Sequence, residues 1–255
     1  MRNRARAPVR SDFVAALRQR AEPLCGGLLL SGLVVSPALG AAAAAAPDPD
    51  AAALARLTQL RAAFLKRIDA EGYKLCPVPQ IELGDPPSFG HFVAERNSVV
   101  VAAWTHLAPE ERKGFEAMAQ SMGGEATGRS VFENGTNRWV FVHELGHWWQ
   151  ACRHQTRPQS YAAENGADRI ALAFWRERDP RYAVGIVHGY RALLTSMPSP
   201  LPEGEEVSTY YDANFARLSQ GNADTWFQAT MIAALAEEQP APSLHRALSQ
   251  PLYPQ

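Results

Sequence analysis

The chain has 255 residues, of which 46% are hydrophobic and 20% are charged, with a formal net charge of −1. This composition excludes an intrinsically disordered, collagen-like or coiled-coil chain, and the length suits one domain with a sizeable core. The near-zero charge argues against a nucleic-acid partner, because no Lys/Arg-rich stripe follows the N-terminal segment.

Residues 1–46 have the order of an export signal, with a basic beginning, an apolar run and then an alanine tract at residues 41–46. We predict a secretory signal peptide that is cleaved near this tract, and therefore a periplasmic or secreted protein. The apolar run is short for a membrane span and contains glycine and proline. The alternative is an uncleaved anchor, and only then would the protein contact a membrane.

Loss of this leader would leave two cysteines, Cys76 and Cys152. An even pair in an oxidising compartment predicts one disulfide. Two buried free thiols are the alternative, because spacing in a sequence does not establish proximity.

Residues 47–255 are predicted to form a single domain that begins with a helix. Either Asp48 or Asp50 can cap its start, and Gly72 follows its end. The apolar residues of this segment recur at intervals of three and four, which predicts a helix that covers the core. They are Leu54, Leu57, Leu60, Phe64 and Ile68.

Short β-type runs follow at residues 78–83, 91–94 and 98–104, and they predict a small antiparallel sheet. A helix is then expected from Pro109 to Met122. From Thr136, a possible N-cap, the pattern is helical almost to the end of the chain. The expected fold class is therefore α+β and mostly helical.

The chemistry is concentrated in the pattern H-E-x-x-H at residues 143–147, inside an apolar helical stretch. His143 and His147 are four residues apart, so both imidazoles lie on one helix face and can bind one zinc ion. Glu144 lies beside them, where it can reach a metal-bound water. Burial of these three side chains is costly without a partner such as a metal, which favours the metal site over the alternative, a helix whose polar side chains are only hydrogen-bonded in place.

A third ligand is expected on the next predicted helix, which carries Glu164 and Asp168. Their spacing of four residues places both carboxylates on one face. Glu164 can bind the metal while Asp168 accepts a hydrogen bond from a ligand histidine. The reverse assignment, with Asp168 as the ligand, stays open at this point.

This arrangement resembles the zincin metallopeptidases, and in particular the thermolysin-like gluzincin branch, over roughly residues 137–170. In that branch H-E-x-x-H is followed on a second helix by Glu, with Asp four residues later. The resemblance implies a zincin-like domain with a small antiparallel sheet and an H-E-x-x-H helix. It also implies that zinc is bound by His143, His147 and Glu164, that Glu144 is the general base, and that Asp168 supports a ligand.

Gluzincins commonly use a downstream Tyr or His to stabilise the oxyanion of the reaction, which implies a second catalytic residue here. The candidates are Tyr210, Tyr211 and His188, and Tyr211 is favoured because it lies in a polar and aromatic run on a predicted helix. Zincins also pair an extended peptide substrate with an edge strand. Residues 98–104 are the candidate edge strand, and a plain buried strand is the equal alternative because of the run Val99-Val100-Val101.

The sequence therefore predicts a zinc-dependent peptidase that acts on a peptide or protein substrate through a zinc-activated water. It does not indicate an oligomeric state. One alternative is a non-catalytic zinc-binding envelope protein with a degenerate peptidase fold, against which Glu144 argues, because a structural site does not require this acid. The other alternative is a zinc amidase that acts on cell-wall peptides.

Overall fold

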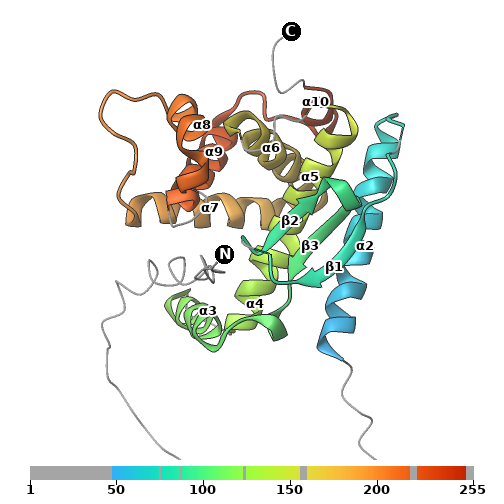
Figure 1. Ribbon diagram of the computed structural model, residues 1–255, viewed down its shortest axis with the longest axis horizontal. Coiled ribbons are helices and arrows are strands. Elements are labelled where there is room, and N and C mark those ends of the chain that lie inside the picture. Colours follow the sequence, from blue (N-terminus) through green and yellow to red (C-terminus); the bar gives the residue numbers. More distant parts are fainter. Residues whose placement is uncertain are drawn as a thin grey trace, which may run out of the picture.

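The computed structural model describes residues 48–250, except for residues 75, 87, 123–124, 156–159 and 219–222. These residues form a mostly helical protein with one three-stranded sheet, which confirms the predicted α+β class (Figure 1). The predicted leader, residues 1–46, lies outside the described residues.

Among the helices of this described part, none combines the length and the apolar character that a membrane crossing requires.

The first described helix, α2 (Pro49–Ala70), begins as predicted. Asp48 is its N-cap and accepts a hydrogen bond from the backbone N–H of Asp50 at 3.0 Å. Four of the five predicted core residues are buried, whereas Leu54 is 39% exposed. The buried face packs against the sheet and against the helix that carries the H-E-x-x-H pattern.

The sheet has the strand order β1-β3-β2, from β1 (Gln80–Gly84), β2 (Gly90–Val93) and β3 (Ser98–Ala102). β2 pairs antiparallel with β3, but β1 pairs parallel with β3, so the prediction of an antiparallel sheet is wrong for one of two pairings. The prediction that residues 98–104 form an edge is also wrong, because β3 is central. The tight connection from β2 to β3 leaves the other side of β3 for β1, and four of the five β3 residues are buried, as a central strand requires.

A continuous helical stretch contains α4 (Gly128–Phe132), the π-helical segment η4 (Glu133–Val140) and α5 (Phe141–Cys152). Thr136 was expected as its N-cap but lies buried within η4. The helix begins earlier because Thr127 and Ser130 form a capping box that satisfies the first N–H groups. The predicted helix before this stretch is confirmed as α3 (Pro109–Met122).

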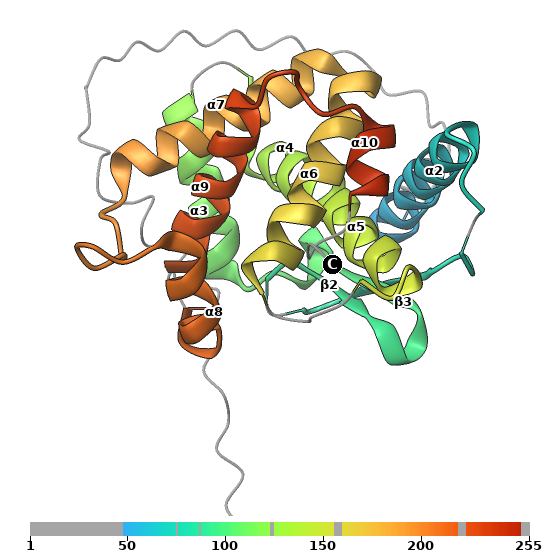
Figure 2. The same ribbon diagram turned by 90° about the horizontal axis from the view of Figure 1, so that it is seen from above.

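The remaining helices are α6 (Tyr161–Arg178), α7 (Pro180–Ser196), α8 (Val207–Leu218), α9 (Ala223–Glu237) and α10 (Leu244–Ser249). α5 lies between the sheet and α6, and α6 in turn contacts α7, α8, α9 and α10. Seen from above, α8 and α9 lie on the side of the molecule opposite α2 (Figure 2).

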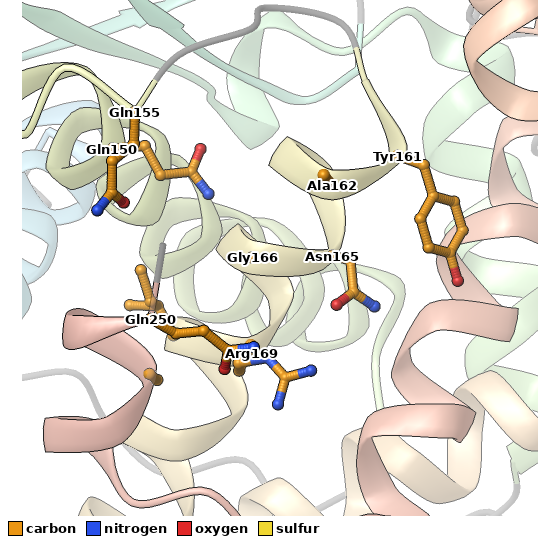
Figure 3. A pocket seen from close by; sticks show the side chains of 10 residues that line it. Gln150, Gln155, Tyr161, Ala162, Asn165, Gly166, Arg169 and Gln250 are labelled. Atoms are coloured by element: carbon orange, nitrogen blue, oxygen red, sulfur yellow. The ribbon is translucent and has the colours of Figure 1, made fainter. Parts of the chain in front are cut away.

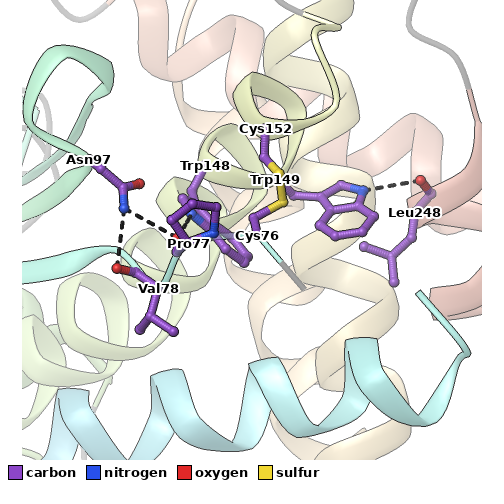
Figure 4. The surroundings of a disulfide bond; sticks show 8 residues. All are labelled: Cys76, Pro77, Val78, Asn97, Trp148, Trp149, Cys152 and Leu248. Atoms are coloured by element: carbon purple, nitrogen blue, oxygen red, sulfur yellow. Dashed lines mark hydrogen bonds between the residues drawn. A yellow bond between two sulfur atoms is a disulfide. The ribbon is translucent and has the colours of Figure 1, made fainter. Parts of the chain in front are cut away.

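A disulfide between Cys76 and Cys152 ties the segment before β1 to the end of α5, which confirms the predicted bond (Figure 4). The two Cα atoms are 6.0 Å apart. Next to it, the indole N–H of Trp148 donates to the carbonyl of Pro77 at 3.0 Å, and that of Trp149 donates to the carbonyl of Leu248 at 3.1 Å. The C-terminal end of α5 is therefore fixed to two distant parts of the chain.

Candidate metal centre

Helix α5, which carries the H-E-x-x-H pattern, is buried on almost every side. Five of its apolar side chains are at most 1% exposed, and its neighbours include the sheet, α2 and α6. A helix that is apolar all round belongs in the interior, where close packing holds each side chain in one position. These apolar residues are Phe141, Val142, Leu145, Trp148 and Trp149.

α5 and α6 approach closely where Gly146 meets Ala167. A Cβ atom at Gly146 would lie 3.0 Å from the Cα atom of Ala167, so no larger side chain fits without a backbone shift. This close approach brings the two histidines of α5 opposite the carboxylates of α6. Gly146 therefore allows the close packing of α5 on α6, a role that the H-E-x-x-H pattern alone does not indicate.

The structure brings together the ligand atoms that the sequence predicts. Nε2 of His143 lies 3.0 Å from Nε2 of His147 and 3.2 Å from Oε2 of Glu164, and the third distance, from His147 to Glu164, is 3.5 Å. A tetrahedral metal with bonds of 2.0–2.1 Å requires ligand atoms about 3.3 Å apart. The His143, His147 and Glu164 group can therefore hold a metal ion.

Each histidine is oriented by a partner on its other ring nitrogen. Nδ1 of His143 lies 2.8 Å from Oδ1 of Asp168, and Nδ1 of His147 lies 3.0 Å from Oε1 of Gln150. Both Nε2 atoms are left to face Glu164. These contacts place Asp168 behind a histidine ligand, as the resemblance implies.

Gln150 was not predicted as a site residue, although it lies three positions after His147 on the same helix. It is 1% exposed, and its amide N–H₂ donates to the carbonyl of Ala163 at 2.8 Å. This bond fixes the amide so that its oxygen faces the Nδ1–H of His147. The helical spacing was the available signal, but an amide three residues from a histidine is too common to indicate a site.

The charges of the group stabilise one another. Burial opposes ionisation of His143, but Asp168 and Glu164 outweigh burial and raise the pKa of His143 well above its usual range. Burial likewise opposes ionisation of Glu164, and the two histidines outweigh it and hold the pKa of Glu164 well below its usual range. Glu164 is therefore present as a carboxylate, the form that binds a metal.

Glu144, the predicted general base, lies between α5 and the edge strand β2. Its side-chain Oε2 accepts a hydrogen bond from the backbone N–H of Phe92 at 2.8 Å, and the residue is 7% exposed. Gly90 makes this contact possible, because a Cβ atom there would collide with Val140 and lie 3.1 Å from Cγ of Glu144. Gly90 is a second residue that sequence reasoning missed.

Tyr211, the predicted oxyanion residue, is buried in α8, and its hydroxyl donates to Oδ1 of Asp224 on α9 at 3.0 Å. Burial, with Asp224 and Glu164 nearby, raises the pKa of Tyr211 above its usual range. Of the two other candidates, Tyr210 accepts a hydrogen bond from Arg217, and His188 is exposed on α7. The catalytic role of Tyr211 stays a prediction.

A separate pocket of about 230 Å³ is lined in part by α6 (Figure 3). Tyr161, Asn165 and Arg169 line it from α6, and Gln150 and Gln155 line it from the end of α5 and the segment that follows. None of the three ligand candidates lines it. The pocket shares Gln150 with the surroundings of the candidate metal centre.

Comparison with family models, curated proteins and solved structures gives no match to this chain. The resemblance to gluzincins therefore depends on the motif, the helix spacing and the geometry described above.

Proposed function

We propose that this protein is a zinc-dependent peptidase. The observation that carries the proposal is the convergence of His143, His147 and Glu164 on one point, with Glu144 next to His143 on the same helix. Within the described residues, His143, His147 and Glu164 are the protein donors that meet at this point. A structural zinc site uses four protein ligands, whereas a catalytic site uses three and leaves one position for water or substrate. Two imidazoles and one carboxylate are a donor set of catalytic zinc.

When bound, zinc would lower the pKa of a coordinated water and polarise the scissile carbonyl. Glu144 would accept one proton from this water as its oxygen attacks the carbonyl carbon. Glu144 would then pass the proton to the amine nitrogen as the carbon–nitrogen bond breaks. Asp168 and Gln150 would keep the two histidines oriented throughout.

The edge strand β2, in place of residues 98–104, is the proposed binding site for an extended peptide. The carbonyl of Phe89 accepts a hydrogen bond from the backbone N–H of Ala102 in β3, so by alternation the backbone groups of Gly90 and Phe92 face the outer edge of β2. Glu144 contacts that edge through Phe92. A substrate that added a strand to β2 would therefore pass beside Glu144 and replace it as the acceptor of the N–H of Phe92.

Export of the protein to the periplasm or the exterior remains part of the proposal. The disulfide between Cys76 and Cys152 supports it, because disulfides persist in oxidising compartments. The basic, apolar and small-residue order of residues 1–46 supports it independently.

The test is the Glu144→Gln variant, which preserves size but cannot accept a proton. We expect full zinc occupancy and an unchanged fold, with peptide hydrolysis reduced by about 10² to 10⁴. The matched control is Glu203→Gln, because Glu203 is exposed and distant in sequence from the centre. Zinc content and hydrolysis of a diverse peptide library are measured on the same preparations.

Undiminished hydrolysis by zinc-loaded Glu144→Gln would contradict the role of Glu144. Zinc binding without hydrolysis by the wild type would favour the non-catalytic envelope protein. Hydrolysis restricted to cell-wall peptides would favour the amidase.

A further inference from the structure

Gln228, on α9, reaches the metal centre from outside the α5–α6 pair. Its side-chain Nε2 donates to Oε2 of Glu164 at 3.1 Å. This is the same oxygen that lies within 3.5 Å of both histidine Nε2 atoms. Gln228 therefore contacts the very atom that would bind the metal.

The position of Gln228 is set by the packing of α9 on α6 and α7. Its neighbours Phe227 and Ala229 are fully buried. Just after the end of α9, Glu238 forms an ion pair with Arg169 of α6. The buried neighbours of Gln228 and the ion pair of Glu238 therefore hold α9 where the Gln228 amide contacts Glu164.

The chemistry of the pair fixes which group of the amide faces Glu164. A carboxylate only accepts hydrogen bonds, so Gln228 must present its N–H₂ group. An amide can donate in this way without carrying a charge. A lysine or arginine here would neutralise Glu164 and repel a divalent cation, whereas glutamine leaves the negative charge available.

We propose that Gln228 is a positioning residue that holds Glu164 for metal binding. With this contact, each of the three ligands has its own partner: Asp168 for His143, Gln150 for His147 and Gln228 for Glu164. Partners of this kind orient a ligand before the metal arrives, and their loss weakens binding by about 10- to 100-fold. The inference rests on the metal centre of the proposed function but requires no catalysis.

The test is Gln228→Met, which keeps the length of the side chain and removes the donor. We expect zinc affinity, measured by competition with a chelator, to fall by about 10-fold. The visible spectrum of the Co²⁺-substituted protein should also change, because Glu164 would no longer be held in one geometry. A role limited to the packing of α9 would lower the melting temperature without altering this spectrum.

The matched control is Thr230→Val on the same helix, where the hydroxyl donates within α9 to the carbonyl of Trp226 at 2.9 Å. We expect its zinc affinity and Co²⁺ spectrum to equal those of the wild type. Gln228→Asn, one methylene shorter, provides a second variant if Gln228→Met does not fold, and it should show the same loss.

Wild-type affinity and spectrum in the folded Gln228 variants would overturn the inference and leave the proposed function intact. Metal binding without hydrolysis by the wild type, with the expected loss in Gln228→Met, would contradict the proposed function alone. A wild-type chain that binds neither Zn²⁺ nor Co²⁺ would overturn both.

Discussion

Two helix pairs contribute to the candidate metal centre, and they differ in how they position their side chains. In the α5–α6 pair the backbones nearly touch at Gly146 and Ala167, and the ligand atoms follow from that contact. In the α8–α9 pair, Tyr211, Asp224 and Gln228 form contacts at the ends of side chains. The comparison indicates that close helix packing sets the positions of the candidate ligand atoms, whereas the α8–α9 pair reaches them through the side chain of Gln228.

The largest combined effect, on stability and on zinc affinity, is expected from Gly146→Ala, which would push α5 away from α6. The added methyl group would press on the backbone of Ala167, which cannot rotate away, so we expect a loss of about 2 to 3 kcal/mol in the free energy of unfolding. Zinc affinity should fall as well, because the histidines move away from Glu164. Chemical denaturation and zinc titration measure the two effects.

The control for this substitution is Gly185→Ala in α7, where an added Cβ meets nothing within 4 Å. Alanine is the better helix former, so this variant should gain about 0.5 to 1 kcal/mol. Equal stability of the two variants would mean that the contact at Gly146 does not set the spacing of α5 and α6.

These two helix pairs also mark how far the sequence could predict the site. His143 and His147 share a face because a helix repeats every 3.6 residues, and Glu164 with Asp168 follows on the next helix. No such periodicity relates Gln228 to Glu164, which are 64 residues apart. That contact depends on how α9 packs, which the sequence of α9 does not specify.

The same reasoning applies to the fold. Capping and apolar spacing were sufficient to predict α2 and α3, because both signals are local. The parallel pairing of β1 with β3 was not predictable, since it depends on which side of β3 the β2 strand occupies. The need for glycine at position 90 was not predictable either, because it depends on the packing of Val140 and Glu144 against β2.

A change in the pH dependence of stability is expected from Asp224→Asn, which tests the contact between α8 and α9. Burial, with a contribution from Glu164, raises the pKa of Asp224 to about 6. An unfolded aspartate has a pKa of about 3.9, so the folded chain binds the extra proton between these values. The contribution of Asp224 to stability is therefore greatest below about pH 4 and is lost as the pH rises through about 6.

Asparagine does not ionise, yet its side-chain oxygen can still accept the hydrogen bond of Tyr211. In metal-free protein we expect the stability of Asp224→Asn to exceed that of the wild type by about 3 kcal/mol at pH 7 and by little at pH 4. Denaturation at both pH values measures this difference. A stability difference that does not vary with pH would show that Asp224 is not a buried charge beside the centre.

We propose that His143, His147 and Glu164 hold the metal while Asp168 orients a ligand. Zinc titration of the wild type, Glu164→Ala and Asp168→Ala tests this proposal. The account predicts one zinc ion per wild-type chain. It also predicts that Asp168→Ala weakens binding by about 10- to 100-fold and that Glu164→Ala weakens it more. Tight zinc binding by Glu164→Ala, together with loss of zinc from Asp168→Ala, would contradict the account.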